Sequence, residues 1–271
     1  MKRNALVMVV MMLLLVGAAL VSAEPVHDRE ALFFRANEAY GAGRFQEAAR
    51  AYEQLIGSGP AGGDVYYNLG NCYVKLHRLG MALLNYERAR ILIPRDADLA
   101  YNSSYAIKQT LDRITPERHS LDNAFFWTDS LTRPEAGMVF AVINILLWTL
   151  LLVRLWRRSE WSFYALLVCT AVWFVSGSAL GWKWYGLAHD SKAVVIVDEA
   201  QVLAGPDSQD TLLFKLHDGA MAIRERREPG WELIRVSKDK RGWIRQDQLR
   251  AVRRTGESSE DGWKSLAGTE R

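Results

Sequence analysis

Hydrophobic and polar positions follow three different patterns along the chain. Between residues 29 and 110, apolar residues recur at the spacing of amphipathic helices. Two uninterrupted apolar runs come next, and after residue 192 short apolar and β-branched runs alternate with Gly, Pro, Asp and Ser. These patterns predict helices, membrane-crossing helices and strands, in that order. The sequence therefore predicts a multi-domain protein with an all-α part, a two-helix transmembrane hairpin and a small all-β barrel.

The predicted helical part, residues 24–114, repeats itself with a period of 34 residues. Small, aromatic and proline residues recur one period apart: Ala36 with Gly70, Ala48 with Ala82, Tyr52 with Tyr86, and Pro60 with Pro94. Small residues at fixed positions let two helices cross closely, and a proline after the second helix ends it. This is the pattern of the tetratricopeptide repeat. A partial third unit follows, and it has the character of a closing helix.

Polar and aromatic residues also recur at this period, and they form a candidate peptide-binding groove. In tetratricopeptide repeats these positions lie on the concave faces of the first helices, where an amide can both donate and accept a hydrogen bond to an extended peptide. The alternative is that they are the ordinary polar residues of a solvated groove. Aromatic neighbours favour an apolar or aromatic-rich ligand over a carboxylate. The candidate groove residues are Phe33, Asn37, Tyr67, Asn68, Asn71, Tyr101 and Asn102.

Two apolar segments, 136–156 and 161–182, are each long enough to cross a membrane as a helix. The turn between them, residues 157–160, and the end of the first segment carry Arg154, Arg157 and Arg158 against a single acid. Arginines in short loops remain on the cytoplasmic side of the membrane. This rule places both flanking soluble parts outside, on the periplasmic side of a bacterial inner membrane.

The N-terminus supports the same orientation. Two basic residues precede an apolar stretch, and small residues end at Ala23, which is the pattern of a secretory signal peptide over residues 1–23. An uncleaved signal anchor is the alternative, and it would leave the topology unchanged. Residues 115–135 are predicted to be a linker that settles at the membrane surface, and residues 183–192 a second linker.

Residues 193–252 predict a small barrel of short strands. The steps Gly230-Trp231 and Gly242-Trp243 resemble the bacterial SH3-like domain, as does the Gly205-Pro206 turn after an early strand. Trp231 and Trp243 are the candidate surface residues of this domain, although in such barrels they serve as core and rim fillers more often than as ligand platforms. Residues 253–271 are polar and rich in Gly and Ser, and are predicted to be a disordered tail.

Composition excludes several classes of function. The formal net charge is +3, with acids and bases interspersed in the soluble parts, so no nucleic-acid partner is predicted. The five histidines are scattered, and no P-loop, HExxH or GxSxG motif occurs. We therefore expect no enzymatic activity, no catalytic residue, no cofactor and no metal site.

The order of parts resembles the BatE family of the bacterial aerotolerance (Bat) operon: signal peptide, tetratricopeptide repeats, membrane hairpin and SH3-like domain. This resemblance implies an envelope complex with membrane proteins that carry von Willebrand factor A domains, and with a MoxR-type ATPase. Membrane lipid and peptidoglycan are further expected contacts. The expected function is a membrane-anchored scaffold for protein binding. The alternatives are an accessory subunit of a secretion or cell-wall assembly machine, and a wall-binding module.

Overall fold

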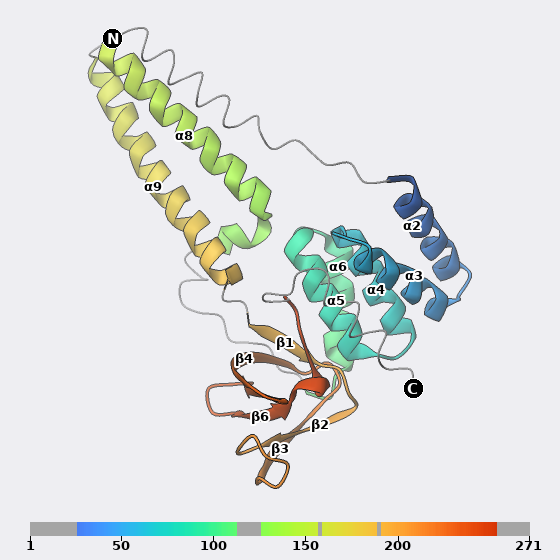
Figure 1. Ribbon diagram of the computed structural model, residues 1–271. Coiled ribbons are helices and arrows are strands. Elements are labelled where there is room, and N and C mark those ends of the chain that lie inside the picture. The colour runs from blue at the N-terminus through green and yellow to red at the C-terminus, as the bar shows by residue number, and fades with distance from the viewer. Residues whose placement is uncertain (1–25, 113–125, 157–158, 189–190, 254–271) are drawn as a thin grey trace.

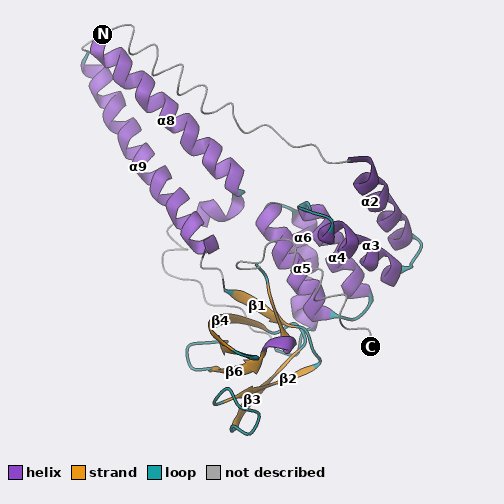
Figure 2. Ribbon diagram, in the orientation of Figure 1, coloured by secondary structure: helices purple, strands orange, loops and turns teal. Residues whose placement is uncertain are grey.

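The computed structural model describes residues 26–112, 126–156, 159–188 and 191–253 (Figure 1). Within these ranges the chain forms seven α-helices and a seven-stranded antiparallel sheet, with the sheet in the C-terminal part (Figure 2). The prediction of a multi-domain protein of helices followed by a β domain is confirmed at this level. The expected signal peptide and nearly all of the expected tail lie outside the described residues.

Five helices form the helical region, which we define as residues 26–112. They are α2 (Val26–Gly41), α3 (Phe45–Gly57), α4 (Gly63–Lys75), α5 (Leu79–Leu92) and α6 (Ala97–Gln109). The helices α2 and α3 form one packed pair, and α4 and α5 form the next. The small residues predicted at the helix crossings are buried: Ala36, Ala48, Gly70 and Ala82.

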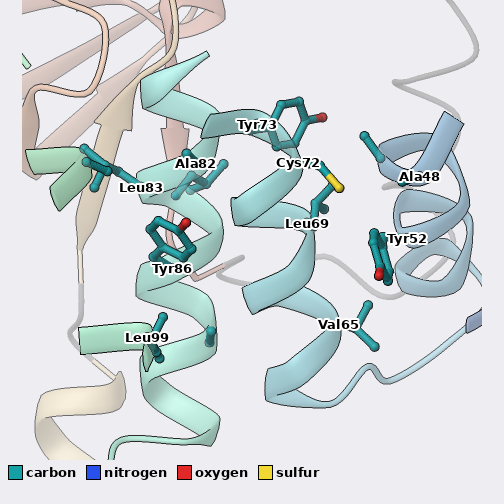
Figure 3. Packing of buried hydrophobic residues seen from close by; sticks show 14 of the residues in the cluster. Ala48, Tyr52, Val65, Leu69, Cys72, Tyr73, Ala82, Leu83, Tyr86 and Leu99 are labelled. Atoms are coloured by element: carbon teal, nitrogen blue, oxygen red, sulfur yellow. The ribbon is translucent and has the colours of Figure 1, made fainter. Parts of the chain in front are cut away.

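The core of this region shows why a small residue is required at each crossing. A Cβ atom added to Gly70 would lie 2.5 Å from the ring of Tyr86, which is itself only 1% exposed. Tyr52 holds the equivalent buried place one period earlier, and Leu69, Cys72 and Leu99 fill the space between the helices (Figure 3). Removing a large buried side chain from such a core costs about 2–5 kcal/mol.

Two long apolar helices extend from the rest of the molecule as a hairpin, α8 (Arg133–Trp156) and α9 (Glu160–Ala188) (Figure 1). Their most apolar 18-residue stretches have a mean hydropathy of 2.4 and 1.8, and both helices are long enough to cross a membrane. They extend beyond the predicted spans, since α8 begins three residues before 136 and α9 ends six residues after 182. The two helices continue into the predicted linkers, through residues 133–135 before the first span and residues 183–188 after the second.

A short 3-10 helix, η1 (Phe126–Ser130), lies at the open end of this hairpin within the predicted linker. The side chain of Lys183 in α9 donates a hydrogen bond to the backbone carbonyl of Thr128, at 2.6 Å. Gly177 allows α8 to approach closely, since a Cβ there would lie 3.1 Å from the ring of Phe140. Gly177 therefore serves the packing between α8 and α9, whereas a Cβ at Gly181 would meet nothing within 4 Å.

The β domain, residues 191–253, is one antiparallel sheet with the strand order β3-β2-β6-β5-β4-β1-β7. Its strands are β1 (Lys192–Val195), β2 (Glu199–Leu203), β3 (Leu212–His217), β4 (Met221–Glu228), β5 (Trp231–Arg235), β6 (Arg241–Arg245) and β7 (Leu249–Ala251). Alternate residues such as Val202, Ile234 and Ile244 fill its core. Trp243 is only 9% exposed and belongs to the buried residues of the domain, whereas Trp231 is half-buried.

The β domain packs directly against α5, and this contact was not predicted. Val194 and Val252 belong to the same hydrophobic cluster as Leu83 of α5. The guanidinium of Arg88 donates to the backbone carbonyls of Ala251 and Val252, both at 3.1 Å. Residues of both parts therefore meet in one hydrophobic cluster, beside the separate cluster that fills the β domain, whereas the sequence suggested two separate modules.

Two further polar contacts close this junction. The carboxylate of Asp112, just after α6, accepts a hydrogen bond from the backbone N–H of His217 at 2.6 Å. The carboxylate of Asp218 lies against the start of α5, beside the backbone N–H groups of Leu79 and Gly80, its first two residues. The residue at the usual capping position, Arg78, makes no side-chain cap. The β domain thus supplies the N-terminal cap that α5 lacks in its own sequence.

Candidate functional site

The helices α2, α4 and α6 are joined by two pairs of asparagines, and we call the side of the helical region that carries these pairs the asparagine face. The Nδ2 atom of Asn68 in α4 donates to Oδ1 of Asn37 in α2, at 3.3 Å. One period later, Nδ2 of Asn102 in α6 donates to Oδ1 of Asn71 in α4, at 3.1 Å. The structure therefore brings together all four asparagines that the sequence predicted as groove residues.

Each asparagine pair is held by a buried tyrosine. The hydroxyl of Tyr52 donates to Oδ1 of Asn37 at 2.5 Å, and that of Tyr86 donates to Oδ1 of Asn71 at 2.6 Å. Burial raises the pKa of both phenols, so both remain protonated donors. The three-residue unit is repeated with the 34-residue period, and Tyr52 and Tyr86 are members that the groove prediction missed.

This arrangement uses one end of each amide for hydrogen bonds inside the helical region. The Oδ1 atoms of Asn37 and Asn71 are each used by two internal donors. In the described part of the chain, the Nδ2 atoms of Asn37 and Asn71 and the Oδ1 atoms of Asn68 and Asn102 make no hydrogen bond to protein. Each pair therefore offers one donor and one acceptor, which is what the backbone of an extended peptide needs.

Aromatic side chains lie beside the amides. Phe33 packs edge-on to Tyr52, with ring centroids 6.2 Å apart, and Tyr67 lies 6.1 Å from Tyr86 and accepts a hydrogen bond from Asn102 at 2.8 Å. Tyr101 of α6 is 72% exposed. The predicted aromatic positions thus differ in role, since Phe33 and Tyr67 support the amide pairs while Tyr101 is directed at solvent.

A fourth aromatic residue was missed in the sequence. Tyr105 is 53% exposed and follows Tyr101 by one helical turn, so both lie on one side of α6. Tyr105 also lies one period after Asn71, at a position that carries an asparagine in the two earlier units. That periodic relation is the signal that could have identified it.

An open hollow of about 600 Å³ lies where α2, the end of α3 and the start of α4 meet. Phe33 lines it together with Phe34, Leu55 and Val65. We call this the α2–α4 hollow. Of the predicted groove residues, only Phe33 takes part in it, and no pattern in the sequence indicated a cavity here.

The β domain leaves the asparagine face uncovered. Its hydrogen bonds and core contacts with the described helical region go to α5 and to Thr110 and Asp112 after α6. None of those hydrogen bonds goes to an asparagine pair. Among the residues that the structure describes, no group of three or more His, Cys, Asp or Glu side chains is placed to hold a metal ion.

Comparisons with known proteins leave the chain without a family assignment. No protein-family model matches it, and no curated protein matches it either. Its function must therefore be inferred from the residues and their geometry.

Proposed function

We propose that this protein is a non-enzymatic, membrane-anchored scaffold whose asparagine face binds extended segments of other proteins. The observation that carries the proposal is the repeated unit of one tyrosine and two asparagines. Each unit is fixed by internal hydrogen bonds and leaves one donor and one acceptor for a ligand. Preorganised polar groups beside exposed aromatic rings bind a peptide at low entropic cost.

In this proposal the helical region is a tetratricopeptide-type repeat and the β domain is SH3-like. The order of parts resembles the BatE family, and on that basis the partners are membrane proteins with von Willebrand factor A domains, with a MoxR-type ATPase acting in the cytoplasm. The β domain braces α5 and has a second protein or peptidoglycan as its own ligand. The physiological setting is the bacterial envelope and its oxygen tolerance.

Substituting Tyr101 and Tyr105 together with serine is expected to reduce partner capture about tenfold. Exposed tyrosines contribute large contact areas to interfaces, and losing two costs about 1–2 kcal/mol of binding free energy. Neither ring is needed for the core, because both are more than half exposed. The measurement is the yield of the von Willebrand-type partner co-purified with the full chain from solubilised membranes.

The matched control is Leu111→Ser, which removes an apolar side chain that is 77% exposed just beyond the same helix. We expect this variant to capture the partner as the unchanged protein does. Equal capture by the double tyrosine variant, with an unchanged circular dichroism spectrum, would show that the asparagine face is not the binding surface.

We propose that α8 and α9 cross the bacterial inner membrane with both soluble parts on the periplasmic side. Support comes from the length and hydropathy of the two helices and from the arginines around their connection. Exposed apolar residues along both helices, such as Leu146 and Phe174, suit contact with lipid chains.

Cysteine labelling tests this orientation. A maleimide that cannot cross membranes is expected to modify Ser208→Cys in intact spheroplasts and to modify Ser159→Cys only after permeabilisation. The native thiols should contribute little, because burial raises the pKa of Cys72 to about 12 and Cys169 lies within α9. Labelling in the reverse order would place the soluble parts in the cytoplasm.

A further inference from the structure

The α2–α4 hollow has walls that suit an apolar side chain. Phe33, Leu55 and Val65 form its interior, and Phe34, which is 68% exposed, stands beside them. An exposed phenylalanine next to an open apolar cavity is a feature of binding surfaces. A volume of about 600 Å³ falls within the range of ligand pockets. A short stretch of a partner's chain therefore has room to enter.

The charged groups around the hollow are unbalanced. Glu30 and Asp64 line it, both are exposed, and neither forms an ion pair within the described residues. Arg29, the one cation among the lining residues, donates from its Nη2 atom to the backbone carbonyl of Pro60 at 2.6 Å, so the lining carries two carboxylates against one cation. Two carboxylates beside an apolar cavity attract a segment that carries both an apolar and a cationic side chain.

We propose that the α2–α4 hollow takes an apolar side chain from an extended partner segment whose neighbouring lysine or arginine is directed at Glu30 and Asp64. This rests on the proposed function, because the hollow and the asparagine pairs share α2 and α4 and a single peptide would engage both. The partner segment is therefore basic and apolar, and the cation can also contact the faces of Phe33 and Phe34.

Acids at the start of helices have a second physical role, which provides a matched control. Asp64 lies in the first turn of α4 and Asp98 in the first turn of α6, where each favours its helix through the helix dipole. Asp98 does not line the hollow. Reversing either charge has a similar effect on its own helix, so Asp98→Lys controls for the effect of the Asp64 change on helix stability.

The test uses the full chain in neutral-detergent micelles and two fluorescein-labelled peptides, one alternating Lys with Leu and the other alternating Glu with Leu. Fluorescence anisotropy is measured at low and high salt, with empty micelles as the blank. We expect the Lys/Leu peptide to bind at least about tenfold more tightly than the Glu/Leu peptide, with the difference falling as salt screens the carboxylates. Equal binding of the two peptides would overturn the proposal.

Two variants then locate the peptide. The double variant Glu30→Lys/Asp64→Lys is expected to weaken Lys/Leu binding about tenfold, and Asp98→Lys to leave it within about twofold. Ala61→Phe places a larger side chain at a lining residue of the hollow, and a similar loss is expected. Equal losses with Glu30→Lys/Asp64→Lys and Asp98→Lys, or full binding by Ala61→Phe, would show that the peptide binds elsewhere.

These results are distinguishable from a failure of the proposed function. If Tyr101→Ser/Tyr105→Ser reduces partner capture while Ala61→Phe does not affect peptide binding, the asparagine face binds partners and the assignment of the hollow is wrong. If all of these variants bind as the unchanged protein does, both proposals are wrong.

Discussion

Gly80→Ala is expected to destabilise the junction between α5 and the β domain by about 2–4 kcal/mol. A Cβ at this position would lie 2.2 Å from both the carbonyl oxygen of Val195 and a carboxylate oxygen of Asp218. The first of these is backbone, which cannot turn aside as a flexible side chain would. Overpacking costs about 1–3 kcal/mol and the loss of a helix cap about 1 kcal/mol.

The sign of the stability change in Gly80→Ala distinguishes a helix docked on the β domain from a free helix. In a helix free of the β domain, alanine is favoured over glycine by about 1 kcal/mol. Gly57→Ala is the matched control, since Gly57 is also helical and a Cβ there meets nothing within 4 Å. Hydrogen exchange of the α5 and β1 amides in the full chain measures the change. Slower exchange in Gly80→Ala than in the unchanged protein would contradict the docked arrangement.

Asp218→Asn tests the capping of α5 apart from the steric clash that Gly80→Ala introduces. Burial raises the pKa of the Asp218 carboxyl above its ordinary value, so the folded state binds a proton more readily than the unfolded state does. The contribution of Asp218 to the free energy of unfolding is therefore greatest below the pKa that this carboxyl has in the unfolded state. It is lost as the pH rises through the pKa that the carboxyl has in the folded state. Asparagine caps a helix as well as aspartate. We expect Asp218→Asn to gain stability relative to the unchanged protein as the pH rises from acidic to neutral.

Asn71→Ala is expected to destabilise the helical region by about 1–3 kcal/mol. The hydroxyl of Tyr86 donates a hydrogen bond to Asn71, and Tyr86 is only 1% exposed. The variant therefore leaves a buried donor without an acceptor. Tyr86→Phe removes that donor and should cost about 1 kcal/mol. The double variant is expected to cost less than the sum of the two single changes, because the unpaired hydroxyl is then absent.

Urea unfolding of the full chain in micelles, followed by far-ultraviolet circular dichroism, measures this cycle. Tyr52→Phe and Asn37→Ala form the matched cycle one period earlier, and similar coupling is expected there. Strict additivity in both cycles would mean that the tyrosine hydroxyls do not hold the asparagines. The same coupling explains why substitution of the exposed tyrosines tests binding better than substitution of Asn71, whose loss also weakens the fold.

The sequence predicted the helical region and the β domain because both depend on local periodicity. The 34-residue period places small residues at each helix crossing, and these residues are buried in the structure. The apolar runs likewise predicted α8 and α9, with errors of a few residues at their ends. Helix ends are the weakest part of such a prediction, because polar residues can continue a helix without changing the apolar pattern.

The sequence also identified the four asparagines, but it could not assign their hydrogen bonds. Which atom of each amide accepts the internal hydrogen bonds cannot be read from the spacing of the asparagines. Only the positions of Tyr52 and Tyr86, each fifteen residues from its asparagine, decide this. The α2–α4 hollow could not be predicted from the sequence either, because it is bounded by three elements whose spacing in the fold no sequence period encodes.

By itself the sequence determined which segments form helices and strands and which residues could meet one period apart, because these follow from local spacing. Tertiary structure alone decided that the two soluble parts pack against each other through a common hydrophobic cluster. Asp218 lies at the start of α5, which begins 139 positions earlier in the chain at Leu79. Arg88 donates to carbonyls that are more than 160 residues away in the chain. Such contacts depend on how the finished elements pack in space, and therefore no local pattern records them.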